Sequence, residues 1–588
     1  MDWAVLLRVI ALARPYKKVF ISAALLTIFQ AALSAIRPKL IQLMVDRHLL
    51  TGVLDGLGFL LFLSVFFILI QAIFRYYFIY STWWLGQSVV RDLRKRVFDH
   101  LIHLRLTYFD KTPIGTSTTR TINDIETLNR VFSNGLITII ADILSVLAVL
   151  GMMFYTSWKL TLICLMTMPL LILATYIFKE KVKKAFQRVR AQIAIMNAYL
   201  QERITGMRII QLFNVEVAEM KKFREINRKY TAANLDSVTY YATFFPVVEI
   251  ISAISLGLMI WWGAQDALRD GGVTLGAIVA FPIYLNMLFR PIRMLADKFN
   301  TIQMGLVASE RVFNLLDFDD KIPNDGTLIP KKFKGDVRFE KVWFSYDEKD
   351  KSNYVLKDIS FEVNAGESLA IVGRTGSGKT TIINILNRFY PLTEGKILID
   401  EVDIKDYDLF ALRKRIAVVL QDVFLFSGTV LQNITMYDEQ ISREKVIAAA
   451  QMIGAHEFIM KLPGGYDYKV MERGATLSMG QRQLISFIRA LVFDPDILIL
   501  DEATSSIDPE SEAVIQYAIE KLIYKRTSFI IAHRLSTIQH VDKVAVLDKG
   551  KLVEIGAPDD LLQNPDSHYK QLYEMQFLHS EERLEVYK

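Results

Sequence analysis

Long apolar stretches in the first half of this 588-residue sequence constrain its fold more than any other feature. A helix that crosses a bilayer needs about 20 predominantly apolar residues, because each residue advances it by only about 1.5 Å. Six stretches meet this requirement, at about 19–45, 58–82, 134–155, 159–178, 242–263 and 274–297. The first half of the chain is therefore predicted to be an α-helical membrane domain with six spans.

Lysine and arginine are distributed unevenly over the segments between these stretches. The N-terminus and the segments 90–130 and 179–230 are rich in both, whereas the loops near 47–57, 156–158 and 264–273 carry few. Positive charge accumulates on the cytosolic side of membrane proteins. We therefore expect a multi-pass protein of the cell (inner or plasma) membrane, with both termini and the second half in the cytosol. The net charge of +6 has the same origin, which argues against a nucleic-acid partner.

The two long cytosolic segments have the pattern of helices rather than of flexible loops. Their charges recur every three or four residues, and glycine and proline are few. Pro113 and Gly115 interrupt the first segment, and Gly206 interrupts the second. We expect the spans to continue into the cytosol as helical hairpins. Their tips, near Gly115 and Gly206, are predicted docking points for a cytosolic domain.

The composition changes after the sixth stretch. The segment from Asp317 to Gly335 collects proline, glycine and charge, as linkers do, and the rest of the chain has a soluble composition. The sequence therefore predicts a membrane domain at 1–316, a linker at 317–335 and a cytosolic domain at 336–588.

A glycine-rich segment of the cytosolic domain predicts a nucleotide site. It fits G-x-x-x-x-G-K-[ST] and lies between an apolar strand and a helix. Backbone N–H groups and the helix N-terminus of such a loop bind phosphates, the lysine reaches the β and γ phosphates, and the last hydroxyl binds Mg²⁺. The predicted nucleotide-binding residues here are Gly373, Arg374, Thr375, Gly376, Ser377, Gly378, Lys379 and Thr380, with Thr380 also a metal ligand.

Two acidic residues follow a second apolar strand, which runs from Ile497 to Leu500. Adjacent acids after a strand are often only a solvated turn. Beside a phosphate loop, however, the first carboxylate can hold Mg²⁺ and the next can orient an attacking water. These roles suit Asp501 and Glu502 respectively.

Further segments give the sequence a close resemblance to ATP-binding cassette (ABC) exporters. The segment LSMGQ, from Leu477 to Gln481, resembles the signature LSGGQ, which separates cassette ATPases from other phosphate-loop proteins. The phosphate-binding segment of the family extends here to Thr381. Six spans before one cassette resemble the half-transporters of the exporter type, so the resemblance covers nearly the whole chain and implies an α/β phosphate-loop ATPase domain.

The resemblance implies roles for individual residues around the nucleotide. Tyr346 matches the aromatic residue that stacks on adenine, and Gln421 matches the family glutamine that binds Mg²⁺ and takes part in catalysis. His533 resembles the histidine that contacts the γ-phosphate and keeps Glu502 and the attacking water in line.

The signature residues Ser478, Gly480 and Gln481 would bind the nucleotide held by the phosphate loop of a second chain. Ser505 to Asp508 resembles the segment known in this family as the D-loop. Glu472 to Gly474 matches an exporter-specific loop that touches the membrane domain. The resemblance therefore implies a dimer, a homodimer or a heterodimer, with two ATP molecules between its cassettes.

The implied function is ATP-driven export of an amphipathic drug, lipid or peptide by alternating access, with ATP and Mg²⁺ as cofactors. Two alternatives share the same motifs, namely an importer with an exporter-like fold, and an ATP-gated channel or regulator. Charged residues within spans are costly and are candidates for cargo contact. Here they are Asp142, Glu249 and Arg290.

Met479 departs from the family signature, which has glycine at this position. A side chain there is expected to prevent the close backbone approach that glycine permits. The chain resembles in this respect heterodimeric exporters with one active and one degenerate site. A homodimer that tolerates methionine is the alternative, because the helix N-terminus that follows is kept.

Overall fold

The computed structural model describes residues 3–52, 54–269, 272–347, 353–501, 509–531, 538 and 540–575. They form two compact units. The membrane unit comprises Met1–Ile102 and Pro113–Asp319, and the cassette unit comprises His103–Thr112 and Asp320–Lys588. The segment His103–Thr112 thus belongs to the cassette unit, although in sequence it lies between two helices of the membrane unit.

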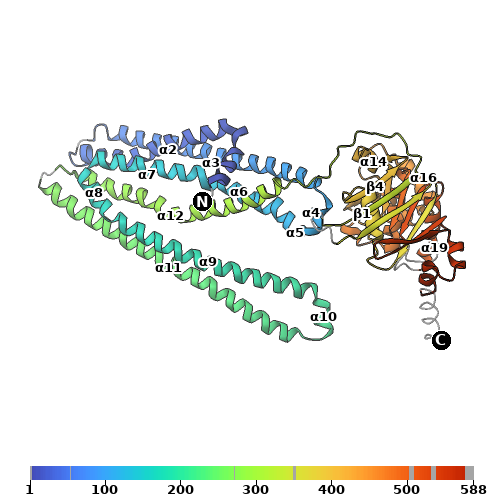
Figure 1. Ribbon diagram of the computed structural model, residues 1–588. Coiled ribbons are helices and arrows are strands. Elements are labelled where there is room, and N and C mark those ends of the chain that lie inside the picture. The colour runs from blue at the N-terminus through green and yellow to red at the C-terminus, as the bar shows by residue number, and fades with distance from the viewer. Residues whose placement is uncertain are drawn as a thin grey trace. The chain divides into compact units, whose positions relative to one another are not determined.

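The membrane unit is entirely helical in its described residues (Figure 1). Its helices are α1 (Trp3–Ala11), α2 (Lys17–Met44), α3 (Leu57–Ile102), α5 (Ile114–Thr119), α6 (Ile125–Arg130), α7 (Ile137–Thr156), α8 (Trp158–Met166), α9 (Met168–Thr205), α10 (Met207–Leu212), α11 (Glu216–Leu268) and α12 (Leu275–Leu316). Short 3₁₀ or π-helical turns extend or join them at η1 (Arg14–Tyr16), η2 (Val45–Leu49), η3 (Arg120–Asp124) and η4 (Val131–Leu136).

Within the described residues, five helical stretches are long and apolar enough to cross a membrane. They are Arg14–Leu49, Leu57–Ile102, Ile114–Thr156, Trp158–Thr205 and Glu216–Leu268. The sixth predicted span, 274–297, lies in α12, whose apolar part Leu275–Pro291 is shorter. The prediction of a helical membrane domain is confirmed.

The two long segments rich in lysine and arginine, 90–130 and 179–230, are helical over most of their length, as predicted. Helix α11 has 53 residues and α9 has 38, so at about 1.5 Å per residue both exceed the roughly 30 Å of a hydrocarbon core. They run side by side to α10, and Gly206 lies at the break between α9 and α10 (Figure 1). Gly115 is the second residue of α5, the helix that begins directly after Pro113.

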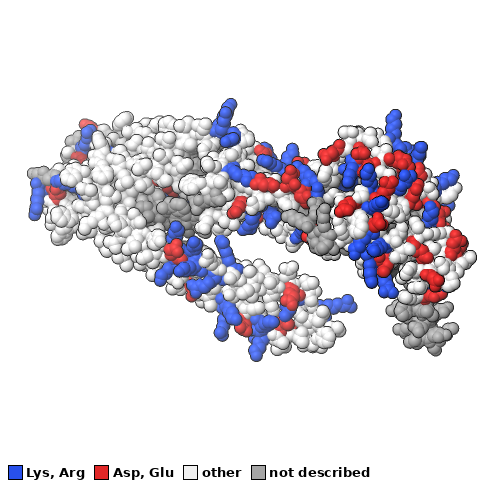
Figure 2. Space-filling view, in the orientation of Figure 1, with Lys and Arg blue, Asp and Glu red and all other residues white. Residues whose placement is uncertain are grey.

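Charge divides this hairpin into two parts. Figure 2 shows lysine, arginine and acidic side chains along the end of α9 and α11 that carries α10, and very few charged side chains on the opposite end. Large apolar side chains are exposed on the uncharged part and on α3, among them Phe59, Phe62 and Trp261. An exposed apolar surface of this extent is expected for helices that face lipid.

A carboxylate joins the ends of α2 and α12. Asp46, in the turn after α2, accepts hydrogen bonds from the Thr274 hydroxyl (2.6 Å) and the Gly276 N–H (2.7 Å). Thr274 is the N-cap of α12, so Asp46 lies where backbone N–H groups of that helix lack intrahelical partners. A Cβ atom on Gly276 would lie 2.4 Å from the carbonyl oxygen of Gln42, so this contact requires glycine.

In the residues that the structure describes, the cassette unit contains three sheets. A four-stranded sheet has the order β2-β1-β4-β5, a six-stranded sheet has the order β12-β11-β3-β10-β9-β6, and β7 pairs with β8. The strands are β1 (Val337–Phe344), β2 (Leu356–Val363), β3 (Ser368–Gly373), β4 (Glu394–Ile399), β5 (Val402–Asp403), β6 (Ile416–Val419), β7 (Gly428–Thr429), β8 (Lys469–Val470), β9 (Ile497–Asp501), β10 (Thr527–Ile531), β11 (Lys543–Asp548) and β12 (Lys551–Gly556).

The helices of the cassette unit connect or cover these sheets. They are α4 (Leu106–Lys111), α13 (Lys379–Leu386), α14 (Leu409–Arg415), α15 (Val430–Thr435), α16 (Arg443–Met452), α17 (His456–Lys461), α18 (Met479–Val492), α19 (Pro509–Ile523) and α21 (Pro558–Gln563). The 3₁₀ turns η5 (Gly465–Asp467) and η6 (Glu472–Gly474) lie between them, and residues 568–575 are also helical.

The six-stranded sheet is parallel except for its edge strand β12 and is covered on both faces. Strand side chains alternate between faces. Leu369 and Ile371 of β3 join one apolar core, which includes helix α13, and Ala370 and Val372 join the other, which includes α18 and α19. This is an α/β domain, as predicted, with the helix of the phosphate loop and the helix of the signature on opposite faces.

The predicted linker is held against the cassette by backbone hydrogen bonds. The Asp400 carboxylate accepts three consecutive N–H groups, from Lys334 (2.7 Å), Gly335 (2.9 Å) and Asp336 (3.0 Å). Farther upstream, the side-chain oxygen of Asn324 accepts the N–H of Leu409 at 2.7 Å. Together these bonds attach the linker to the cassette at two places.

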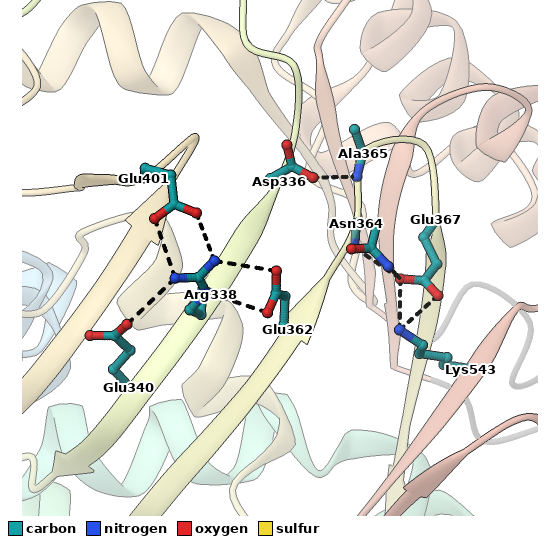
Figure 3. A network of polar contacts seen from close by, with 9 residues as sticks. All are labelled: Asp336, Arg338, Glu340, Glu362, Asn364, Ala365, Glu367, Glu401 and Lys543. Carbon is teal, nitrogen blue, oxygen red and sulfur yellow. Dashed lines mark hydrogen bonds and ion pairs between the residues drawn. The ribbon is translucent and has the colours of Figure 1, made fainter.

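An ion-pair network lies beside this attachment (Figure 3). Arg338 on β1 pairs with Glu340 (3.8 Å), Glu362 (3.4 Å) and Glu401 (2.6 Å), which joins β1 to β2 and to the turn between β4 and β5. The side chains are substantially exposed, and exposed pairs contribute about 0–1 kcal/mol each. The backbone bonds to Asp400 are therefore expected to matter more for stability.

We expect Asp400→Ala to lower the unfolding temperature of the cassette unit in the full-length protein. Loss of the acceptor leaves the N–H groups of Lys334, Gly335 and Asp336 without this partner, at a cost of about 1–3 kcal/mol. Differential scanning calorimetry measures the change. The control is Glu401→Gln, which changes the neighbouring carboxylate and leaves the linker bonds in place. Equal unfolding temperatures for the two variants would contradict this account.

Candidate active site

The phosphate loop leaves β3 and enters α13 through three glycines with positive φ angles. They are Gly373 (φ 153°), Gly376 (φ 82°) and Gly378 (φ 104°). A Cβ atom on Gly373 would lie 2.2 Å from the carbonyl oxygen of Leu547, and one on Gly378 would lie 2.6 Å from the side chain of Leu356. The path of the loop therefore depends on glycine at both ends, in conformation and in space.

The residues of this loop fit a bound anion. Lys379 is buried, and its ammonium donates to the carbonyl oxygens of Gly373 (2.8 Å) and Arg374 (3.2 Å). The Ser377 hydroxyl is buried and has no hydrogen-bond partner among the described residues. A buried hydroxyl without a partner is costly unless a ligand supplies one. Together with the N-terminus of α13, these groups suit a phosphate chain.

The exposed members of the predicted set surround this buried part. Arg374, Thr375, Gly376 and Thr380 are exposed, whereas Thr381 is buried in the first turn of α13. The Thr380 hydroxyl is therefore accessible to a metal ion at the mouth of the loop. The Thr381 hydroxyl is engaged by Tyr346, whose phenol oxygen lies 3.1 Å away.

Parallel strands bring two further predicted residues to the edge of the sheet from which the phosphate loop leaves. Asp501 is the last residue of β9 and is buried. Gln421 follows the end of β6 by two residues, and β6 is the parallel neighbour of β9, with Val419 opposite Leu500. Strand β10 alone separates β9 from β3, so their ends lie about 10 Å apart. Ligands of open α/β sheets bind at this edge.

Other predicted residues lie outside the part of the chain that the structure describes. Glu502 and the segment from Ser505 to Asp508 follow β9, and His533 follows the last residue of β10, Ile531. Ile531 is the parallel partner of Asp501. The strands before Glu502 and His533 are thus neighbours, while the roles of the two residues stay predictions.

The signature begins helix α18. Ser478 is its N-cap, where the hydroxyl accepts the N–H of Gln481 (3.2 Å) and the Gln481 side chain accepts the N–H of Ser478 (3.0 Å). Gly480, between them, is buried. This reciprocal pair uses the acceptor capacity of the serine and leaves its O–H and the N-terminus of α18 available to a ligand.

Met479 is the first residue of α18 and is not among the non-glycine residues with positive φ angles. Its backbone therefore needs no glycine. Compared with the family glycine, Met479 adds a half-buried side chain beside Ser478 and introduces no backbone strain. Just upstream, Arg473 has a φ angle of 56° within the turn η6.

The three candidate cargo residues differ in their surroundings. Asp142 of α7 forms an ion pair with Lys298 of α12, and both side chains are largely buried. The pair neutralises a charge that otherwise would be costly within a span. Glu249 and Arg290 are exposed in the single chain.

Sequence reasoning missed two residues that adjoin the predicted adenine site. The ring of Tyr390 packs against that of Tyr346, and its hydroxyl donates to a carboxylate oxygen of Asp110. Asp110 lies 280 positions away in sequence, in α4, and neither residue belongs to a motif. Only the folded structure brings them together.

The fold and this site define a class of protein, a membrane transporter with an ATP-binding domain. Comparison with known families identifies the chain within that class. The ABC transporter transmembrane region matches residues 20–292, and the ABC transporter domain matches residues 356–505.

Relatives match over nearly the full length. An uncharacterized ABC transporter ATP-binding protein of Bacillus subtilis is 39% identical over 95% of this chain and 93% of its own length. A second B. subtilis protein, named for multidrug export, is 35% identical over 98% of this chain and all of its own length. An ATP-dependent lipid A-core flippase of Syntrophus aciditrophicus is 34% identical over 97% of this chain and 94% of its own.

The chain therefore belongs to the ABC transporters and is a half-transporter of the exporter type. It is an ATP-hydrolysing, multi-pass membrane protein.

We expect Lys379→Ala to weaken ATP binding at least tenfold, equivalent to about 1.4 kcal/mol, because it removes a buried charge-assisted donor to the phosphates. Equilibrium binding of ATP to the purified full-length protein provides the measurement. Lys396→Ala, at an exposed lysine of β4, serves as the control. Unchanged affinity in Lys379→Ala would exclude the phosphate-loop assignment.

Proposed function

We propose that this chain is one half of a dimeric exporter that moves an amphipathic drug, lipid or peptide outward across the membrane by alternating access. The observation that carries the proposal is the convergence of the phosphate loop, Asp501 and Gln421 on one edge of the sheet, in a chain with long apolar helices. The names of the relatives, which refer to multidrug export and to a lipid A-core flippase, support the substrate class.

Each site residue has a role in this proposal. Lys379 and the N-terminus of α13 bind the phosphates, and Tyr346 stacks on the adenine. Glu502 orients the attacking water, and His533 contacts the γ-phosphate. These groups act by position and charge, as phosphoryl transfer requires.

The metal site in this proposal consists of Thr380, Gln421 and Asp501, which supply one hydroxyl, one amide oxygen and one carboxylate. When bound there, Mg²⁺ would supply positive charge that offsets the charge of the phosphates. Such oxygen donors suit Mg²⁺, which takes few protein ligands and relies on phosphate oxygens and water for the rest.

A second chain is needed because of where the signature lies. Helix α18 packs on one face of the six-stranded sheet and α13 packs on the other. We infer that Ser478, Gly480 and Gln481 bind the nucleotide held by a partner's phosphate loop. Each site would then require both chains.

The two cytosolic tips connect the cassettes to the spans in this mechanism. The tip at Gly206 carries exposed apolar side chains on and around α10, among them Ile204, Ile209, Leu212, Phe213 and Val217. Apolar surface of this kind at a cytosolic tip is expected to be covered by a protein partner. We propose that a cassette of the dimer covers it, and that the tip near Gly115 is the second connection.

The proposal places the chain in the inner or plasma membrane, with termini and cassette in the cytosol. The charged end of the α9–α11 hairpin supports this orientation, because cytosolic segments carry the excess of lysine and arginine (Figure 2). Export, import and channel activity differ in their flux. ATP-dependent uptake into inside-out but not right-side-out vesicles supports export, the reverse supports import, and ion current without turnover supports a channel.

We expect Glu502→Gln to bind ATP with unchanged affinity and to hydrolyse it at least about a hundredfold more slowly, since it loses the group that orients water. Steady-state phosphate release and equilibrium ATP binding are measured on the same preparation. Glu520→Gln, on the exposed side of α19, is the control. Near-normal turnover in Glu502→Gln would remove this residue from the mechanism.

We expect the chain purified alone to hydrolyse ATP weakly, and Met479→Gly to raise the rate at least about fivefold by allowing closer approach of the signature backbone to the phosphates. The partner that supplies an intact signature would then be a different chain. Robust, substrate-stimulated activity of the unsubstituted chain would instead identify a homodimer.

A further inference from the structure

A cluster of three aromatic rings lies beside the predicted adenine site. The Tyr346 ring meets the Tyr390 ring edge to face, with centroids 5.0 Å apart and planes at 87°. Phe344 meets Tyr346 in the same way at 4.8 Å and Tyr390 at 6.1 Å. Tyr390 and Phe344 are buried, whereas Tyr346 is 38% exposed. Tyr346 therefore has surface available to a base, and its buried side is in contact with Tyr390.

Tyr346 is also tied to the helix of the phosphate loop. Its phenol oxygen lies 3.1 Å from the Thr381 hydroxyl and accepts from the Asn384 amide at 3.3 Å. Both partners belong to α13. These two contacts fix the phenol end of the ring against α13, and the exposed part of the ring is left to the base that it would stack on.

The other end of the cluster is attached to the segment His103–Thr112. The Tyr390 hydroxyl donates to a carboxylate oxygen of Asp110, in α4. Burial, followed by the neighbouring carboxylate, raises the pKa of the Tyr390 phenol well above its usual value, so the phenol remains a donor throughout the physiological range. Two contacts of Asp320 also hold this segment, an ion pair to Arg105 (3.2 Å) and a hydrogen bond from Thr107 (3.3 Å).

We propose that Tyr390 is a positioning residue. A purine base stacked on Tyr346 would act through the Tyr390 ring and strengthen the hydrogen bond from Tyr390 to Asp110. The proposal rests on the proposed function, because adenine stacking on Tyr346 is part of it. Packed rings change position together, since a close-packed interior has no space in which one can move alone. A hydrogen bond weakens steeply as its angle departs from linear, so a small shift of the Tyr390 ring alters its bond to Asp110.

The segment His103–Thr112 connects α3 to α5, two helices of the membrane unit. If the hydrogen bond from Tyr390 to Asp110 depends on the base, this connection between cassette and spans would respond to the whole nucleotide rather than to its phosphates alone. Phosphate-chain ligands without a base would occupy the loop at Lys379 and leave the hydrogen bond from Tyr390 to Asp110 unchanged.

Hydrogen–deuterium exchange of the full-length protein in lipid nanodiscs tests the proposal. The ligands are a non-hydrolysable ATP analogue and inorganic tripolyphosphate. With the analogue, we expect slower exchange in peptides covering both α13 and residues 104–112. With tripolyphosphate, we expect slower exchange in α13 only.

Tyr390→Phe removes the hydroxyl and keeps the ring. In this variant the analogue-dependent slowing at 104–112 should fall at least about threefold, as expected for the loss of a hydrogen bond to a charged group, while that at α13 persists. Tyr354→Phe is the matched control, because the Tyr354 hydroxyl also donates to a carboxylate of the same unit, Glu394, at 3.1 Å. It should behave as the unsubstituted protein does.

A second variant, Asp110→Ala, removes the other partner at an exposed position, so it leaves the aromatic cluster packed even if Tyr390→Phe disturbs the fold. It should show the same selective loss. If exchange at 104–112 is still slowed by the analogue in Asp110→Ala, or is slowed by tripolyphosphate, the inference is wrong and the proposed function is unaffected. Absence of any slowing at α13 in the unsubstituted protein overturns the proposed function, and the inference with it.

Discussion

The membrane unit is shaped by one requirement, that a peptide group in hydrocarbon must find its hydrogen-bond partner within the protein. A helix meets this requirement residue by residue and has no reason to end at the membrane surface. Helix α11 accordingly continues over 53 residues and contains Pro246 within its length. The same bonds that allow it to cross the bilayer make the part beyond the bilayer stiff. Stiff extensions can carry a movement of the cassettes to the spans, which flexible loops of the same length could not do.

Features whose determinants are local could be predicted from the sequence. An apolar stretch of about 20 residues specifies a span by its own composition, and the eight residues from Gly373 to Thr380 specify a phosphate loop by theirs. The position of Asp501 at the sheet edge could be predicted because an apolar strand directly precedes it, while its role as a metal ligand stays a prediction. The sixth span was harder to define, because Arg290 and Arg293 lie in its second half, Lys298 follows it directly, and α12 continues without a break to Leu316.

Features that depend on contacts between distant residues could not be predicted. Asp400 holds the linker at Gly335, and Tyr390 holds Asp110, but aspartate and tyrosine are common residues and neither pair leaves a local pattern. The inclusion of His103–Thr112 in the cassette unit has the same cause. For Met479, sequence reasoning identified the departure from glycine. Only the backbone, which enters α18 there with an ordinary helical conformation, shows that the change concerns a side chain.

The geometry of the cassette connects chemistry to movement. Because α13 and α18 lie on opposite faces of one sheet, a phosphate loop cannot be completed by the signature of its own chain without rebuilding that sheet. In the proposed dimer, completion by a second chain would require the two cassettes to approach, so closure and assembly of the site would be one event. The segment His103–Thr112 belongs to the cassette unit, and the peptide chain joins it to α3 and α5. In the proposed mechanism, an approach of the cassettes would act on the ends of those two helices through this covalent connection.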